Sequence, residues 1–133
     1  MAMAEDQVEI VRTALTALDR RDLELYLSIA SPEIELFTPA SPLEGPSVGH
    51  EGIRRFFEET EAHTESSSVE VEEIRDLGPQ VLAFFTVTAV GRLSGAETSL
   101  DVGGLYSVQD GKLRRAQIYA DRREALQAAG LSE

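Results

Sequence analysis

Apolar residues recur at helical spacing in the first half of the chain. Between Val8 and Leu18 they step by three, four and three residues, which places them on one stripe of a helix over about residues 5–20. The same pattern predicts a short second helix over about 22–30 and a third helix over about 50–62. Three helices are therefore expected before the sheet is complete.

Alternation of apolar and polar residues predicts strands in the rest of the chain. The expected strands cover about residues 33–37, 69–75, 81–91, 97–109 and 112–120, and a short last helix covers about 122–128. Asp110-Gly111 is a strong hairpin signal between the last two strands. Inside a strand, Gly103-Gly104 indicates either a bulge or the close approach of another part of the backbone.

Helices followed by a meander of strands are typical of the α+β class, with three to four helices packed against a curved antiparallel sheet. A chain of 133 residues has a natural single-domain length, so one domain is expected over residues 1–133. The one long irregular connection runs from Thr38 to Gly49 and contains three prolines and two glycines. Such loops often form the lid or mouth of a site.

One face of the predicted sheet is apolar where an enzyme would need acids and bases. It carries Ala83, Phe85, Val87, Ala89, Leu100, Val102, Ala116, Ile118 and Ala120. With the helices, this face is expected to enclose a hydrophobic pocket lined by Leu18, Tyr26, Phe37, Phe57, Thr60, Phe85, Val87, Leu100, Val102 and Ile118. The predicted ligand is a small apolar or cyclic molecule.

The opposite face of the predicted sheet mixes apolar and polar residues. It carries Phe84, Thr86, Thr88, Val90, Leu105, Leu113, Gln117 and Tyr119. A large apolar patch is unfavourable on the surface of a monomer. The pattern therefore predicts that this outer sheet face is covered, and we expect a two-fold homodimer formed through it.

Acidic residues outnumber basic ones by 24 to 12, which gives a formal net charge of -12. A chain this acidic repels phosphate backbones, so no nucleic-acid partner is expected. Arginines occur in pairs at positions 20–21, 54–55, 114–115 and 122–123, and acidic residues flank the first and the last pair directly. The favoured interpretation of these pairs is a solvated surface, and an anion clamp for a substrate is the alternative.

The sequence holds no cysteine, which excludes disulfides, thiolate metal sites and a cysteine nucleophile. It also shows no metal-ligand spacing, phosphate-binding glycine loop or serine elbow, so neither a metal nor a cofactor is expected. No segment approaches the ~20 apolar residues of a membrane span, and the N-terminus does not resemble a signal peptide. A cytoplasmic protein without a membrane partner is expected.

Three residues are candidates for acid–base chemistry. Glu35 lies between Ile34 and Leu36, so it faces solvent if those two face the helices, and alternation favours this arrangement. If the strand turns the other way, Glu35 enters the cavity as a desolvated carboxylate that could transfer a proton. His50 could act as a base or bond the neighbouring loop. Arg114 could grip a ligand oxygen at the pocket rim or lie in water.

The order and spacing of three segments resemble the SnoaL-like family of the nuclear-transport-factor-2-like superfamily. These segments are Val48–Phe56 (VGHEGIRRF), Asp110–Lys112 (DGK) and Tyr119–Arg122 (YADR). The resemblance covers nearly the whole chain and implies a cone-shaped α+β domain. It leaves the activity open, because this fold hosts hydrolases, isomerases, cyclases and non-enzymatic binders. Similar proteins often dimerise through the outer sheet face.

The best-known activities of that superfamily do not carry over residue by residue. The acid–arginine–acid relay of limonene-epoxide hydrolases falls on Val87, Phe85 and Ile118, and their water-holding tyrosine and asparagine fall on Glu35 and Phe37. The positions nearest to the base, tyrosine and protonated acid of ketosteroid isomerases are Thr38, Ala14 and Gly104. The acid expected in a SnoaL-type polyketide cyclase has no counterpart beyond the three candidates above.

Three functions remain open from the sequence. The first is a SnoaL-like small-molecule pocket protein of unassigned activity that binds an apolar or cyclic ligand without the acid–arginine–acid relay. The second is an enzyme of isomerase, cyclase or hydrolase type that uses Glu35 with His50 or Arg114. The third is a non-enzymatic protein-interaction module whose sheet face binds another protein.

Overall fold

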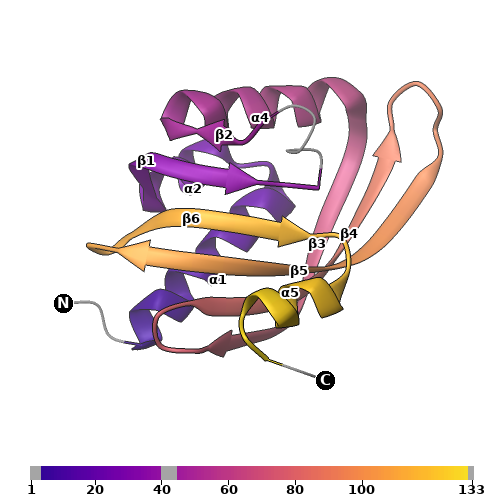
Figure 1. Ribbon diagram of the computed structural model, residues 1–133. Coiled ribbons are helices and arrows are strands. Elements are labelled where there is room, and N and C mark those ends of the chain that lie inside the picture. The colour runs from indigo at the N-terminus through magenta and orange to yellow at the C-terminus, as the bar shows by residue number, and fades with distance from the viewer. Residues whose placement is uncertain (1–3, 40–44, 132–133) are drawn as a thin grey trace.

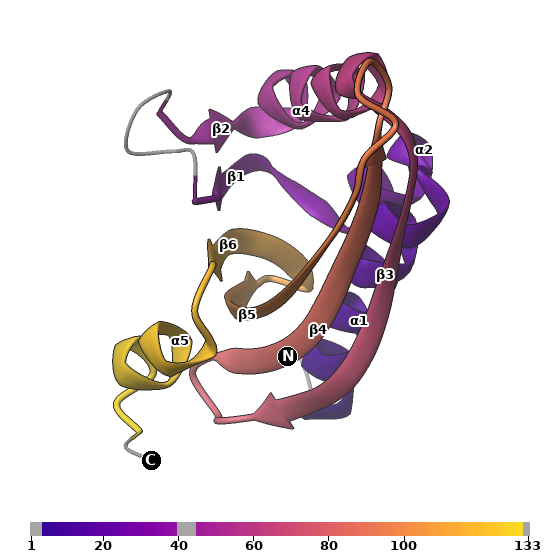
Figure 2. The same cartoon turned by 90° about the vertical axis from the view of Figure 1, so that its right-hand side faces the viewer.

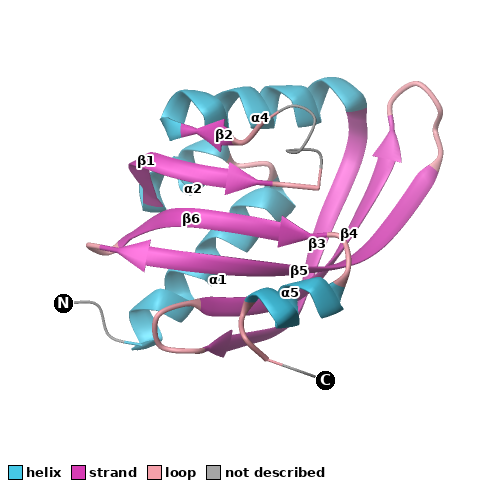
Figure 3. Cartoon of the chain, in the orientation of Figure 1, coloured by secondary structure: helices cyan, strands magenta, loops and turns pink. Residues whose placement is uncertain are grey.

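The computed structural model describes residues 4–39 and 45–131. The helices in this part of the chain are α1 (Ala4–Arg20), α2 (Leu23–Ile29), α4 (Gly49–His63) and α5 (Arg122–Ala128). The strands are β1 (Ala30–Phe37), β2 (Ser47–Val48), β3 (Thr64–Asp76), β4 (Val81–Gly91), β5 (Glu97–Gln109) and β6 (Lys112–Tyr119), as Figure 3 shows. Part of the predicted loop between Thr38 and Gly49, residues 40–44, lies outside the described residues.

The strands form one six-stranded sheet in the order β2-β1-β6-β5-β4-β3. Strands β3 to β6 follow one another as an antiparallel meander, as predicted, and β2 pairs antiparallel with β1. The expectation of an entirely antiparallel sheet is wrong, because β1 pairs parallel with β6. No tight turn joins these two strands, so their relative direction is set by where β1 docks on the sheet. The α+β class is confirmed.

The sheet separates two unequal layers of helix. Helices α1, α2 and α4 lie on one side of it, and the short α5 lies on the other (Figure 1). Figure 2 shows how strongly β3 and β4 bend around the first layer. The sheet therefore has an inner face toward α1, α2 and α4, and an outer face toward α5.

The main core fills the space between the inner face and the helices. Its fully buried members include Val11 and Leu15 of α1, Ile53 of α4, and Ile34 of β1. Since Ile34 and Leu36 are both buried on this side, the residues between and after them on β1 point the other way. This alternation decides the orientation of the candidate Glu35.

A second apolar cluster lies on the outer face, where α5 covers the sheet. It joins Leu82, Phe84 and Leu105 of the sheet to Ala125 and Leu126 of α5. Phe84 and Leu105 are only 8% and 6% exposed within the single chain. The cover that the sequence predicts for these two residues is therefore provided by the chain's own last helix and needs no second chain.

The expected outward orientation of Leu113 is also wrong. A register shift between Ser107 and Val108 leaves Arg114 as the extra residue of a bulge in β6. The bulge reverses the alternation, so that Leu113 joins Ala116 in the main core and is fully buried. A pattern with a strict period of two cannot reveal such a bulge.

Gly103 and Gly104 are not at a bulge, and the atoms that approach them closely belong to side chains rather than to another backbone. A Cβ on Gly103 would lie 2.6 Å from the Cβ of Ala125, so α5 can pack this closely only against glycine. A Cβ on Gly104 would lie 2.7 Å from the Tyr106 ring, which covers it from the inner side. At each glycine a neighbouring side chain packs closely against β5, and the bulge of this hairpin lies at Arg114 of β6.

Two strands begin several residues earlier than predicted. Strand β3 begins at Thr64 rather than near residue 69, because its polar start pairs with the end of β4, where Ser66 lies opposite Val90. Serine has a weak intrinsic preference for strands, so only the neighbouring strand reveals this segment. Strand β1 begins at Ala30, a residue that the sequence places in the preceding helix.

Candidate functional site

A cavity of about 580 Å³ lies between α4, the junction of α1 and α2, and the inner face of the sheet. Its lining residues are Leu18, Arg21, Leu23, Thr38, Pro39, Phe56, Phe57, Glu58, Thr60, Glu61, Thr64, Ser67, Val69, Phe85, Val87, Ala89, Leu100, Val102 and Ile118. Leu100 is 56% exposed although it lines the cavity, so the cavity opens to solvent beside this residue.

The sheet side of the cavity is an apolar wall. One row of this wall crosses three strands: Val69 of β3 lies opposite Val87 of β4, and Val87 lies opposite Leu100 of β5. In the next row, Phe85 of β4 lies opposite Val102 of β5. All five residues line the cavity, together with Ile118 of β6. The positions that the resemblance assigns to an acid–arginine–acid relay therefore do meet in one cavity, and here they carry only hydrocarbon.

Eight of the ten residues predicted to line the pocket do so. The two exceptions are Tyr26 and Phe37. Tyr26 is buried in the core behind Phe57, whose ring it meets edge-on at 5.6 Å. Phe37 follows the buried Leu36 and so points to the outer face, where the Arg115 guanidinium lies 4.6 Å from its ring centroid.

The core holds two buried tyrosines that do not reach the cavity. Burial raises the pKa of the Tyr26 hydroxyl above its ordinary value. The pKa of Tyr106 is also raised, first by burial and then by the neighbouring Tyr26. The Tyr106 hydroxyl has no hydrogen-bond partner within the described part of the chain. Both groups stay neutral at physiological pH and act as core residues.

The three acid–base candidates do not meet in the cavity. Glu35 and Arg114 form an ion pair at 3.7 Å with both side chains about one-third exposed, and Arg114 also donates to the Glu33 carbonyl. Nε2 of His50 donates to the Ala30 carbonyl oxygen at 2.9 Å, which ties the start of α4 to β1. None of the three candidates lines the cavity. The structure brings Glu35 and Arg114 together, but away from any apolar pocket.

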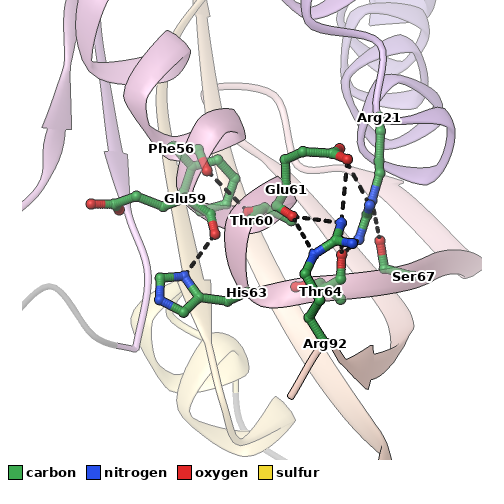
Figure 4. A network of polar contacts seen from close by, with 9 residues as sticks. All are labelled: Arg21, Phe56, Glu59, Thr60, Glu61, His63, Thr64, Ser67 and Arg92. Carbon is green, nitrogen blue, oxygen red and sulfur yellow. Dashed lines mark hydrogen bonds and ion pairs between the residues drawn. The ribbon is translucent and has the colours of Figure 1, made fainter. Parts of the chain in front are cut away.

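The polar part of the cavity lies at one end, where α1 meets α4 and β3. There the Arg21 guanidinium bonds Ser67, the Thr64 carbonyl and Glu61, and Arg92 approaches Glu61 and Thr64 from the other side (Figure 4). Arg21, Glu61, Thr64 and Ser67 all line the cavity. The cavity therefore has apolar walls and one polar end.

Sequence analysis missed several lining residues, among them Arg21, Phe56, Ser67 and Val69. Ser67 and Val69 share the inner face of β3, and their alternation would indicate this if the strand were extended to Thr64. Phe56 lies on the apolar side of the predicted third helix, next to Phe57. No sequence signal shows that Arg21 turns toward a cavity rather than toward water.

Within residues 4–39 and 45–131, no group of three or more histidine, aspartate and glutamate side chains could hold a metal ion. No helix in this part of the chain is long and apolar enough to span a membrane.

The fold is that of the nuclear-transport-factor-2-like proteins. An NTF2-like protein of unknown function from Burkholderia pseudomallei superposes with a TM-score of 0.78 at 20% identity, with 96% of this chain and 97% of that chain covered. TerC, co-crystallised with polyporic acid, gives 0.77 at 23% identity, with 95% and 97% covered. An epoxide hydrolase from M. tuberculosis gives 0.73 at 16% identity, with 93% and 91% covered.

Within this fold class, a family model identifies the family of the chain. The model of the SnoaL-like domain matches residues 11–116, which is most of the chain, so the protein belongs to the SnoaL-like family. No curated protein matches the sequence. At these identities the solved structures define the fold, and the function has to be argued from the site.

Proposed function

We propose that this protein binds an apolar small molecule in the cavity between α4 and the inner face of the sheet. The observation that carries the proposal is the apolar wall built by Val69, Phe85, Val87, Val102 and Ile118 around about 580 Å³ of space. Ligand pockets of a few hundred cubic ångströms with apolar walls and few polar groups are typical small-molecule sites. The open side beside Leu100 provides an entrance.

The enzyme hypothesis built on Glu35 receives no support from this geometry. A general acid or base must lie within hydrogen-bond reach of its substrate, whereas the Glu35 carboxylate lies on the outer side of β1. TerC, which has the same fold, was co-crystallised with polyporic acid. This supports the proposal, because a protein of the same fold was crystallised together with an organic small molecule.

The proposed function predicts binding of the neutral apolar dye N-phenylnaphthylamine. Its fluorescence should rise on titration with the protein, with a dissociation constant on the order of 1–10 μM, because a naphthalene and a phenyl ring leave water for an apolar wall. Native mass spectrometry should show a one-to-one complex per chain. Fluorescence that does not saturate, together with no complex in the mass spectrum, would refute ligand binding in the cavity.

We also propose a homodimer, formed through the part of the outer face that α5 leaves open. This region includes Phe37, Arg115, Gln117 and Tyr119, around a second hollow beside β6. In a chain of net charge -12, two copies repel each other over most of their surfaces. The residues around the second hollow are uncharged except for Arg115 and Glu124, whose charges cancel, so a second copy meets little repulsion here.

The dimer proposal predicts a mass of twice the 14.5 kDa of one chain in light scattering at micromolar concentration. Gln117→Arg should shift this mass toward that of the monomer, because two like charges would then face each other across the two-fold axis. A wild-type mass of 14.5 kDa would contradict the proposal.

The cytoplasmic location and the absence of a nucleic-acid partner stay predictions from the sequence.

A further inference from the structure

We propose that Arg21 binds an anionic oxygen group at the polar end of the cavity, so that the ligand is an apolar molecule carrying one acidic group. This inference rests on the proposed function, because it needs the cavity to be a binding site. In the sequence, an anion clamp is the alternative interpretation of the arginine pairs. The present inference assigns anion binding to Arg21 alone.

The backbone at Arg21 is the first reason. Arg21 follows the last residue of α1 and has a φ of 54°, in the left-handed region that glycine and asparagine adopt most readily. Only Arg21 and Asp110 among the non-glycine residues of the described chain have a positive φ. An arginine at such a position costs conformational energy that glycine would avoid, so contacts of its side chain have to offset that cost.

Those contacts hold the guanidinium at the cavity wall. Nε donates to Ser67 Oγ at 3.1 Å, Nη2 donates to the Thr64 carbonyl at 2.9 Å, and Nη1 donates to a Glu61 carboxylate oxygen at 3.3 Å (Figure 4). A guanidinium has five N–H groups, so two remain without a partner in the described part of the chain. The side chain is 21% exposed, so the remaining donors are partly shielded from solvent.

The charge balance at this end of the cavity is the second reason. Glu61 pairs with Arg21 at 3.3 Å and with Arg92 at 3.4 Å, so one carboxylate faces two guanidinium groups. This cluster of three has a net charge of +1 in a chain that is otherwise strongly acidic. Glu58 at the rim and Arg92 are both more exposed than Arg21, so water screens their charges more strongly than that of the Arg21 guanidinium.

Among the described residues that line the cavity, Arg21 is the only cation, so an acidic group on a ligand would meet its most favourable partner at this end. The guanidinium fork suits carboxylate and related oxyanions, and its hydrogen bonds are charge-assisted. Elsewhere the same group would be desolvated against Phe85, Val87 and Ile118, which offer no donor. The ligand is therefore oriented with its acidic group toward Arg21 and its apolar body against the sheet.

Two dyes that share one apolar skeleton test this inference. Anilinonaphthalene sulfonate carries an anionic group that neutral N-phenylnaphthylamine lacks. We expect Arg21→Gln to weaken binding of the sulfonate dye about tenfold and to change binding of the neutral dye less than about twofold. Arg21→Lys, which keeps the charge, should retain most of the sulfonate affinity. Arg20→Gln is the matched control, because it removes the same charge from the exposed end of α1 next door.

The possible results separate this inference from the proposed function. If Arg21→Gln weakens both dyes equally, or neither, Arg21 only joins α1 to α4 and β3, and the inference is wrong. An equal loss of sulfonate binding in Arg20→Gln would attribute the effect to net charge and would also overturn it. If the neutral dye does not bind the wild-type protein, the proposed function itself fails. Thermal melting of each variant shows that the compared proteins are folded. Where Arg21→Gln is not folded, Arg21→Gly repeats the comparison, because it removes the same charge and suits the left-handed backbone.

Discussion

Val87→Trp is expected to weaken binding of N-phenylnaphthylamine at least tenfold, a loss of about 1.4 kcal/mol. Val87 lies in the centre of the apolar wall, opposite Val69 on one side and Leu100 on the other. An indole at this position would extend into the space that the dye needs. The fold should tolerate it, because the larger side chain enters an existing cavity rather than a filled core.

Thr88→Trp is the matched control for this experiment. Thr88 follows Val87 on β4 and points to the outer face, where its hydroxyl lies 3.2 Å from the Ser99 hydroxyl. Since the chain has no native tryptophan, each variant gains a single fluorophore of its own. Blue-shifted emission at position 87 would show that the indole is shielded from water. Unchanged dye affinity together with that blue shift would mean that the dye binds elsewhere.

Leu126→Asp is expected to lower the free energy of unfolding by about 2–4 kcal/mol. Leu126 is 6% exposed and packs with Ala125 against the outer sheet face. A carboxylate there has no partner in the apolar cluster, so α5 should leave the sheet rather than bury the charge. Leu82, Phe84 and Leu105 would then be exposed together, which should also promote self-association.

Urea denaturation measures this effect, and Gln127→Asp is the matched control on the exposed side of the same helix. The control should shift the stability by less than about 0.5 kcal/mol, as surface substitutions usually do. Equal stability of the two variants would contradict the view that α5 is an integral cover of the outer face. Light scattering of Leu126→Asp adds a second readout, because an exposed patch should raise its apparent mass.

The way α5 is attached explains why a seven-residue helix can cover the sheet. Arg122, its first residue, donates to Glu72 of β3 at 2.6 Å and lies 5.4 Å from the centroid of the Phe84 ring. The hydrogen bond from Arg122 holds the pKa of Glu72 below its ordinary value. Asp121 caps the helix by accepting from the Arg123 backbone N–H, as expected for this position. Polar contacts at the start and apolar contacts at the end thus fix the helix.

The cavity has consequences for chemistry on this fold. At the positions that hold the relay of limonene-epoxide hydrolases by resemblance, this chain carries Val87, Phe85 and Ile118, and all three line the cavity. The ionisable groups that line it lie at its rim, with Arg21 and Glu61 at the polar end. Among the described residues, the ionisable side chains beside the cavity therefore lie at its rim and not at the centre of the sheet.

Much of the fold follows from the sequence, because its signals are local. The stripe from Val8 to Leu18 identifies α1, and Asp110-Gly111 forms the β5–β6 hairpin with Asp110 and Gly111 at positive φ. Alternation along β4 and β5 places Phe85, Val87 and Val102 on the same face without knowledge of any partner strand. The apolar character of the cavity wall was predictable for the same reason.

Only the tertiary structure decided what covers each face and which polar groups reach the cavity. The bulge at Arg114 turns Leu113 inward, and the close approach at Gly103 lets α5 bury Phe84 in place of a second chain. Arg20 and Arg21 are equivalent in the sequence, yet a left-handed backbone turns Arg21 toward Ser67 and the cavity. Such outcomes depend on contacts between residues far apart in the chain, which no local pattern encodes.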